Sequence, residues 1–473
     1  MSTKDTQELL ALLENSMTIE DGNAIVTDAA RLRANIYKLA EVSALESGAR
    51  QGMARYLTRL AGLAMGAYPA SINDLYMARG RGEVPFSFTV PAINLRVLSF
   101  DAARAVFRAA LSIDAGAFIF EIARSEMGYT DQRPAEYVTN ILAAAIAEGY
   151  QGPIFVQGDH FQVSAKRFSN DPETELQAVR DLIVEAIQAG FYNIDIDTST
   201  LVDLSKTTIP EQQYLNTSLS AMFTAYIRSL EPTGITISVG GEIGEVGGHN
   251  STVEELRGYM DGYNAELNAQ APGATGISKI SIQTGTSHGG VVLPDGSIAK
   301  VNLDFDTLLR LSRVSRQEYG LGGAVQHGAS TLPEDAFTHF VESEAVEVHL
   351  ATNFQNMFFD LAPADLRAQM YAYLDEKSAS ERKPGMTDEQ FYYKTRKNVI
   401  GPFKKQTWGL PAHEKAKIGI AWEAQFLKLF KFLGLPGTRP FVEQAIRHVA
   451  VNPSIKFYLG AEVAEGDVSD LAD

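Results

Sequence analysis

Five side chains that can bind a metal or move a proton stand at or near the ends of apolar runs. Asp159 and His160 follow one run, Glu242 lies within another, and His288 and His327 follow two more. Neutral imidazole is the commonest protein ligand of zinc, and three protein ligands leave one coordination position for substrate. One histidine at a strand end is usually structural, but three together, beside two carboxylates, favour a metal site.

The two later histidines are each followed at once by glycine, in TGTSHGG and QHGAS. Glycines such as Gly289 and Gly328 let backbone N–H groups approach a ligand closely and form a concave anion site. Ser330 and Thr352 can add hydroxyl donors to the same oxygens. A metal beside such a phosphate cradle suits a small phosphorylated ketose.

The elements that must position these side chains alternate between short apolar runs and amphipathic helical stretches from about residue 86 onward. Eight strands, each followed by a helix, predict an α/β chain folded as a closed parallel (β/α)₈ barrel. That barrel puts its strand ends, and hence the five side chains, at one mouth. An open doubly wound sheet would need a glycine-rich turn after the first strand, and VPAINLRV is not one. The predicted strands are 86–92, 117–123, 153–159, 192–199, 236–244, 279–285, 322–328 and 345–352.

The predicted organisation is a barrel over 81–375 between a helical extension over 1–80 and another over 376–473. Residues 1–80 show apolar spacing typical of helices only. We expect the N-terminal extension to be a packing or oligomerisation element, and the protein to be a homodimer or homotetramer.

Composition excludes several classes of function. The chain has 473 residues and no cysteine, so disulfides, thiolate metal sites and a cysteine nucleophile are excluded. Its formal charge of −17 argues against binding of nucleic acid or of an anionic membrane surface. No apolar stretch approaches the ~18 residues of a membrane span, and the polar N-terminus is no signal peptide. We therefore expect a cytoplasmic protein.

Over roughly residues 85–370 the motifs together resemble the class II fructose-bisphosphate aldolase family. GDH at 158–160 resembles that family's Asp-His pair, and GGEIGEVGGHN at 240–250 its Glu-containing Gly-Gly segment. TGTSHGG and VQHGASTLPEDAF resemble its second and third histidine motifs. VPAINLRV resembles its opening strand, in which Asn94 takes the place of a substrate-contacting asparagine.

The resemblance implies a zinc-dependent aldolase, or one using another divalent metal, that cleaves fructose 1,6-bisphosphate through an enediolate. Asp159 would move the proton of the C4 hydroxyl. A sodium or potassium ion would sit near the C1 phosphate, and Ser125 is a looser match to a further phosphate contact. The implied metal ligands are His160, His288, His327 and, as an alternate, Glu242; the implied C1 phosphate ligands are Gly289, Gly328, Ser330 and Thr352.

The sequence departs from the family pattern at two places. The family's loop glutamate is replaced by His249 and Asn250, so that His249, Glu254 or Glu255 would have to exchange the substrate proton. In the last strand, His349 stands where the family has asparagine. These changes make tagatose 1,6-bisphosphate or a sulfo-sugar phosphate plausible substrates.

Lys404 and Lys405, in GPFKKQTW, are candidates for binding the distal phosphate, in the same subunit or in a neighbouring one. The alternative interpretation is a solvated basic loop.

Three other functions compete with the zinc aldolase. A Schiff-base aldolase needs a lysine facing the active-site mouth, whereas Lys279 begins the sixth predicted strand, at the opposite end. A zinc hydrolase on the same fold would use a metal-activated water. A non-catalytic aldolase-like partner subunit would explain the missing loop glutamate, but retention of the three histidines and Asp159 argues against it.

Overall fold

The computed structural model describes residues 3–244, 249–285, 293, 303–329, 332–460 and 471. Eight parallel strands pair in chain order, and the last pairs with the first, so the sheet closes into a barrel and the predicted fold is confirmed. Its strands are β4 (Val90–Asn94), β5 (Ile119–Ala123), β6 (Gly152–Gln162), β7 (Asn193–Asp197), β8 (Ser238–Glu242), β9 (Lys279–Ile282), β10 (Ala324–Gln326) and β11 (Glu347–Leu350).

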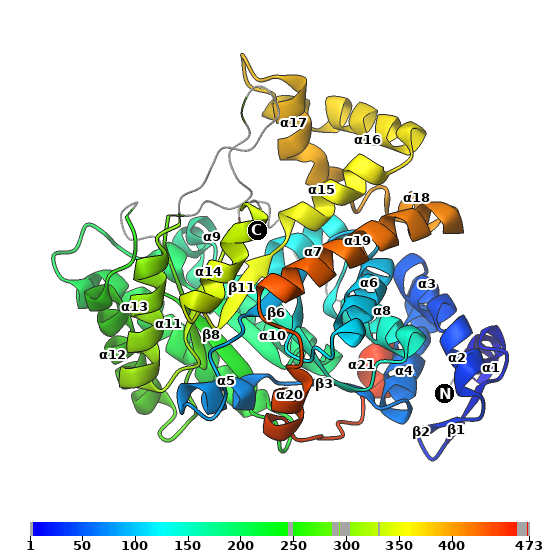
Figure 1. Cartoon of the computed structure of the whole chain (residues 1–473), viewed down its shortest axis with the longest axis horizontal. Helices are drawn as coiled ribbons and strands as arrows, with labels where there is room; N and C mark the ends of the chain where they lie inside the picture. The colour runs from blue at the N-terminus through cyan, green and yellow to red at the C-terminus, as the bar shows by residue number, and fades with distance from the viewer. Residues whose placement is uncertain are drawn as a thin grey trace.

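Helices follow each strand and surround the barrel (Figure 1). Their apolar faces pack against the outer faces of the strands, which is why the strands are buried on both sides. These helices are α6 (Ser99–Ser112), α7 (Arg124–Thr130), α8 (Pro134–Glu148), α9 (Ala165–Asn170), α10 (Pro172–Ala189), α11 (Ile209–Leu230), α12 (Val253–Gln270), α13 (Phe305–Tyr319), α14 (Phe337–Glu342) and α15 (Thr352–Leu361).

The first barrel strand begins later than the predicted residue 86. The backbone N–H of Thr89 donates to the carbonyl of Leu433, 2.9 Å away, so this stretch joins the C-terminal segment before the chain enters the barrel at Val90. Asn94 is consequently the last residue of β4, at the mouth of the barrel.

The expectation that residues 1–80 are purely helical is wrong. β1 (Met17–Glu20) and β2 (Asn23–Val26) form an antiparallel hairpin across Asp21 and Gly22, both with positive φ. β3 (Ala67–Ala70) lies parallel to the first half of β6, whose second half pairs with β7. The helices of this region are α1 (Thr3–Leu12), α2 (Ala29–Asn35), α3 (Tyr37–Leu45), α4 (Gly48–Ala64) and α5 (Asn73–Gly80).

The C-terminal region is helical, and its longest helix, α19, packs against α6 on the outside of the barrel. In Figure 1, α16 and α17 stand at the top of the molecule, beyond α15. The helices are α16 (Ala364–Lys377), α17 (Asp388–Thr395), α18 (Lys404–Trp408), α19 (Ala412–Phe432), α20 (Arg439–Ala445) and α21 (Ile455–Leu459).

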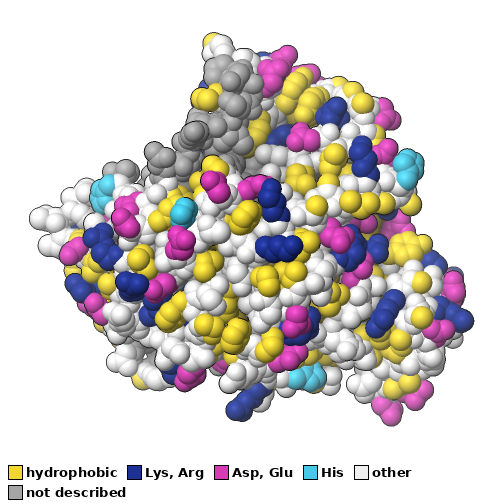
Figure 2. Space-filling view, in the orientation of Figure 1, with side chains coloured by type: hydrophobic (Ala, Val, Ile, Leu, Met, Phe, Trp, Pro, Cys, Tyr) yellow, Lys and Arg dark blue, Asp and Glu magenta, His cyan; other side chains and the backbone are white. Residues whose placement is uncertain are grey.

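The surface carries charges of both signs. On the face shown in Figure 2, Lys and Arg side chains are interspersed with Asp and Glu side chains. Among the described residues, no helix has the length and apolar character needed to cross a membrane.

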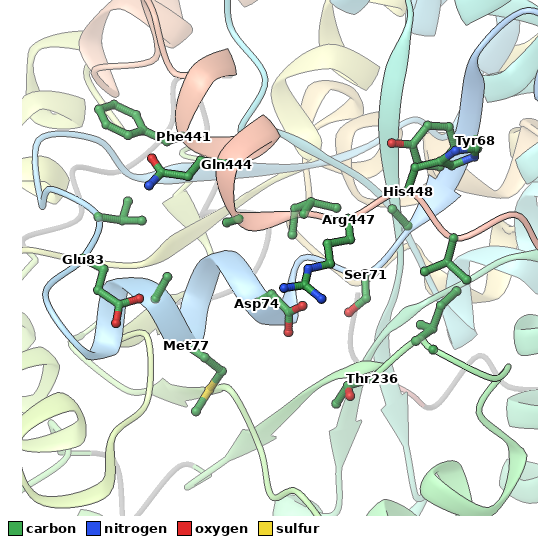
Figure 3. Close-up of a pocket in the computed structure, with 18 of the residues that line it drawn as sticks. Tyr68, Ser71, Asp74, Met77, Glu83, Thr236, Phe441, Gln444, Arg447 and His448 are labelled. Carbon is green, nitrogen blue, oxygen red and sulfur yellow. The ribbon is translucent and has the colours of Figure 1, made fainter.

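Helix α5 closes the end of the barrel where the strands begin. The Ile72 N–H, just before α5, donates to Asn193 Oδ1 at 2.8 Å, and the Tyr76 hydroxyl donates to Glu347 inside the barrel. Outside α5 lies a cavity of about 650 Å³ between this helix and the segment after α20 (Figure 3). There the His448 ring lies against Tyr68, with centroids 4.1 Å apart. Residues near the starts of the strands line this cavity, so it lies at the opposite end of the barrel from the mouth that holds Asp159 and His160.

Candidate metal centre in the barrel

A bulge in β6 aims His160 into the barrel mouth. The register between β6 and β7 shifts between Gly158 and Phe161, and His160 has φ of 40°, a left-handed conformation that is rare outside glycine. A Cβ on Gly158 would lie 2.3 Å from the buried Phe161 ring, so glycine is needed for the bulge to fold. Such local strain, held in place by a packed core, is typical of functional positions.

His160 and His327 face each other across the mouth. The Nε2 atom of His160 lies 3.1 Å from Nδ1 of His327, and the ring centroids are 4.4 Å apart. Nδ1 of His160 lies 3.1 Å from Asp197 Oδ2 and 3.4 Å from Glu242 Oε2. His160, Glu242 and His327 each offer a ligand atom, and these atoms lie within 4.8 Å of one another. Two imidazoles and a carboxylate this close form a suitable donor set for zinc.

Asp159 is held beside the two histidines. Its Oδ2 accepts a hydrogen bond from Asn94 Nδ2 at 3.2 Å, and the same amide donates to Glu126 at 2.8 Å. Oδ1 of Asp159 is buried and accepts no hydrogen bond, although it lies 3.2 Å from Nδ1 of His349. Arg96 pairs with Glu126 at 2.6 Å and thereby fixes the group that orients Asn94.

The interior of the barrel is charged, where many barrels of this fold are filled by aliphatic side chains. The Lys279 ammonium lies in ion pairs with Asp195, at 2.9 Å, and with Glu347. Glu347 also accepts a hydrogen bond from Nε2 of His349 at 2.7 Å. Glu121 lies 3.1 Å from the other nitrogen of that ring. A chain of buried charges therefore runs from Lys279 to the mouth.

The pKa values in this cluster indicate excess negative charge. Burial alone lowers the pKa of His160, but Asp159, Glu242 and Asp197 outweigh it and hold the pKa well above its usual range. Burial and the nearby carboxylate of Asp197 raise the pKa of Glu242 to about 8. Burial and the Asp159 charge raise the pKa of Glu121 to about 8. A divalent cation would neutralise the same carboxylates, so the residues present fit a metal.

Comparison with known proteins decides the family. A family model described as "Fructose-bisphosphate aldolase class-II" matches residues 86–406, which span all eight barrel strands. The chain belongs to the class II fructose-bisphosphate aldolase family. This family is generally dependent on a divalent metal, and its members act on phosphorylated sugars. No curated protein matches the chain.

Solved structures share the aldolase fold at low sequence identity. The fructuronate-tagaturonate epimerase UxaE from Cohnella laeviribosi aligns with a TM-score of 0.53 and 11% identity, covering 89% of this chain and 90% of that one. A probable tagatose 6 phosphate kinase from Sinorhizobium meliloti 1021 aligns with a TM-score of 0.50 and 15% identity, covering 78% and 96%. The fructose-bisphosphate aldolase of Campylobacter jejuni aligns with a TM-score of 0.47 and 16% identity, covering 78% and 96%. The first two likenesses show the fold alone.

Some of the predicted aldolase site residues lie outside the described residues: His288, Gly289 and Ser330. Those that the structure brings together at the mouth are Asn94, Asp159, His160, Glu242, His327 and His349. Gly328 follows His327 with φ of 70°, which glycine adopts without strain. Thr352 is the first residue of α15, and Ser125 is buried in the first turn of α7.

The remaining candidates lie in loops or in the C-terminal region. The exposed His249 ring lies 3.8 Å from Glu255, whose carboxylate accepts the Thr252 N–H and so caps α12. Asn250 donates to Asp304 at 3.0 Å.

Lys404 donates to Glu136 on α8 at 2.8 Å, and Lys405 is the next residue of α18. A role for these two lysines in binding the distal phosphate stays a prediction.

Sequence reasoning missed the acidic partners of this candidate site. Asp195 and Asp197 alternate in NIDID, and residues two apart in a strand share a face. Both carboxylates therefore enter the barrel, where one contacts Lys279 and the other His160. The alternation was a readable signal. The sequence gives no comparable signal for the contacts of Lys279 and of Glu121 with other strands, because these residues meet only in the closed barrel.

Proposed function

We propose that the chain is a metal-dependent aldolase that reversibly cleaves fructose 1,6-bisphosphate to dihydroxyacetone phosphate and glyceraldehyde 3-phosphate. The observation that carries the proposal is the placement of Asp159 beside the facing histidines His160 and His327. A carboxylate base thus lies next to a donor set that suits a Lewis acid.

Asp159 is suited to move the proton of the C4 hydroxyl. Its burial raises the pKa, but His160, His349 and His327 together hold the pKa well below its usual range, so the carboxylate is ionised. Asn94 fixes its Oδ2 atom while Oδ1 remains without a hydrogen bond, which leaves one oxygen to accept the hydroxyl proton. A divalent metal in this centre would polarise the ketone and stabilise the charge that develops on C–C cleavage.

The phosphate at C1 would bind near the ends of β10 and β11. Gly328 and Thr352 follow these strands, and Thr352 begins α15, whose N-terminal N–H groups attract an anion. By the family resemblance, Gly289 and Ser330 would complete this cradle, with a sodium or potassium ion nearby.

A Schiff-base mechanism is disfavoured by the surroundings of Lys279. Its ammonium is buried between Asp195 and Glu347, and these carboxylates raise its pKa above the usual value in spite of burial. A nucleophilic lysine needs the opposite shift.

A different ketose phosphate is the second candidate substrate. His349 replaces the family's asparagine and lies 3.2 Å from the proposed base Asp159. Contacts at this point act on the C4 hydroxyl, so tagatose 1,6-bisphosphate or a sulfo-sugar phosphate is the alternative.

The test is a cleavage assay on fructose 1,6-bisphosphate and its C4 epimer, with dihydroxyacetone phosphate measured through NADH-dependent reduction. We expect release that chelator abolishes and zinc restores. Full activity in excess chelator, with no metal detected, would refute the proposal. Cleavage of the epimer alone would move the substrate to the second candidate.

Asp159→Asn should lower turnover about 10²–10⁴-fold, the usual contribution of a general base. Asp171→Asn is the matched control, because Asp171 is an exposed cap of α10 and asparagine caps equally well. Normal turnover in Asp159→Asn would show that its assigned role is wrong.

A further inference from the structure

Among the described residues of the candidate site, His349 departs from the family pattern and yet lies at its centre. Its side chain is buried, and its ring lies against that of His327, tilted by 43° with centroids 3.9 Å apart. Packing alone does not account for a side chain that places both ring nitrogens among carboxylates.

The hydrogen bond to Glu347 orients the ring. Nε2 of His349 lies 2.7 Å from Glu347 Oε1, and an ionised carboxylate can only accept, so Nε2 carries a proton. A metal bound at Nδ1 would displace the second proton of the charged ring and take the lone pair there. A histidine that donates one N–H to a carboxylate while its other nitrogen faces a cluster of donors has the arrangement common to metal-ligating histidines.

The Asp159 oxygen that faces Nδ1 is also without a hydrogen bond. Nδ1 of His349 and Oδ1 of Asp159 are both buried, and neither forms a hydrogen bond, although they lie 3.2 Å apart. Asp159, His327 and His349 each offer a ligand atom, and all three atoms lie within 4.8 Å of one another. Two unsatisfied buried ligand atoms side by side are costly unless a cation or proton lies between them.

Charge favours a cation. Four carboxylates surround the His349 ring, and Lys279 is the one permanent cation in contact with them among the described side chains. A single ammonium leaves this group negative. The four carboxylates are those of Glu121, Asp159, Asp195 and Glu347.

We infer that His349 is a ligand of the divalent metal at an inner position formed with Asp159 and His327. This inner position lies on the side of Glu347 and Lys279, which are the first residues of β11 and β9. His160, Glu242 and His327 form the outer position. His327 belongs to both sets, and a neutral imidazole serves one metal at a time, so the two sets are alternative positions of one ion. The inference rests on the metal dependence in the proposed function.

Cobalt(II) is the probe, because its visible absorption reports the number and kind of its ligands. The full chain, stripped with chelator, is titrated with Co²⁺, and the spectrum, the Kd and the bound equivalents are measured. The variant is His349→Asn, which restores the family's residue and removes the imidazole. The matched control is His339→Asn, because His339 is half exposed and pairs with Glu342 on the outside of the molecule.

We expect His349→Asn to weaken Co²⁺ binding at least about tenfold and to change the visible spectrum, while His339→Asn behaves as the parent. An unchanged Kd and spectrum in His349→Asn would overturn the inference, as would a parent that binds no Co²⁺. Thermal unfolding in excess chelator shows whether the variant folds, and His349→Gln serves if His349→Asn does not.

The two proposals fail separately. Metal-dependent cleavage by the parent, with Co²⁺ binding unaffected by His349→Asn, would remove the inner ligand and leave the aldolase. Binding of Co²⁺ that depends on His349, in a chain that cleaves no ketose phosphate, would do the reverse.

Discussion

Gly158→Ala tests whether the bulge in β6 is what places His160. The added Cβ would lie 2.3 Å from Cε1 and 2.4 Å from Cζ of Phe161, against a normal carbon–carbon contact of about 3.5–4.0 Å. Phe161 is fully buried, so the ring has no open space into which to rotate. Overpacking of this kind costs about 1–3 kcal/mol, and relief requires the bulge itself to shift.

The expected result has two parts. Urea denaturation of the metal-free protein should show a loss of about 1–3 kcal/mol in the free energy of unfolding. Co²⁺ affinity should fall as well, because His160 lies between the two clashing residues and its direction depends on the same stretch of backbone. Phe161→Leu in the same chain should recover part of both losses, with a coupling energy of about 1–3 kcal/mol.

Gly419→Ala is the matched control. Gly419 lies within α19, and its added Cβ would meet only Arg108 Nη2 at 3.7 Å, an ordinary contact. Alanine there should raise stability by up to about 1 kcal/mol through helix propensity. If Gly158→Ala matched the parent in both stability and Co²⁺ affinity, the claim that this glycine shapes the site would be wrong.

Three further perturbations probe the charges. Asp197→Asn removes the carboxylate that holds His160 Nδ1 and should weaken metal binding about 10–100-fold in a chelator competition; unchanged affinity would contradict that role. Lys279→Met leaves Asp195 and Glu347 buried without their ammonium and should cost about 3–5 kcal/mol on urea unfolding, whereas the exposed Lys417→Met should cost little. Glu136 has its pKa raised by burial from 4.5 to about 7, so the folded state binds the extra proton and this group lowers stability as pH rises from about 4.5 to 7. Glu136→Gln should remove that slope, changing the stability difference from the parent by up to about 3 kcal/mol across the window; parallel pH profiles would refute the assignment.

The sequence alone determined the barrel, because a parallel strand buried on both faces is a short apolar run whose end is marked by polar residues. It placed Asp159, His160 and His327 at one mouth for the same reason: parallel strands of a barrel all end on one side. It missed the β1–β2 hairpin, although Asp21-Gly22 is a turn signal, since four-residue strands carry little periodicity. It missed β3 because AYPA, residues 67–70, forms a strand only by pairing with the first half of the long β6.

Tertiary structure decided the geometry of the candidate site. The direction of His160 depends on the bulge in β6, in which the Phe161 ring packs on Gly158. No local propensity encodes the φ of 40° that His160 adopts there. Glu121, Asp195, Lys279 and Glu347 come from four different strands and acquire their pKa values from one another after the barrel has closed. Coulombic coupling of this strength needs charges a few ångströms apart in a medium of low dielectric constant. The residue types at the strand ends can be identified from the sequence, whereas the distances between those strand ends are set by the closed sheet.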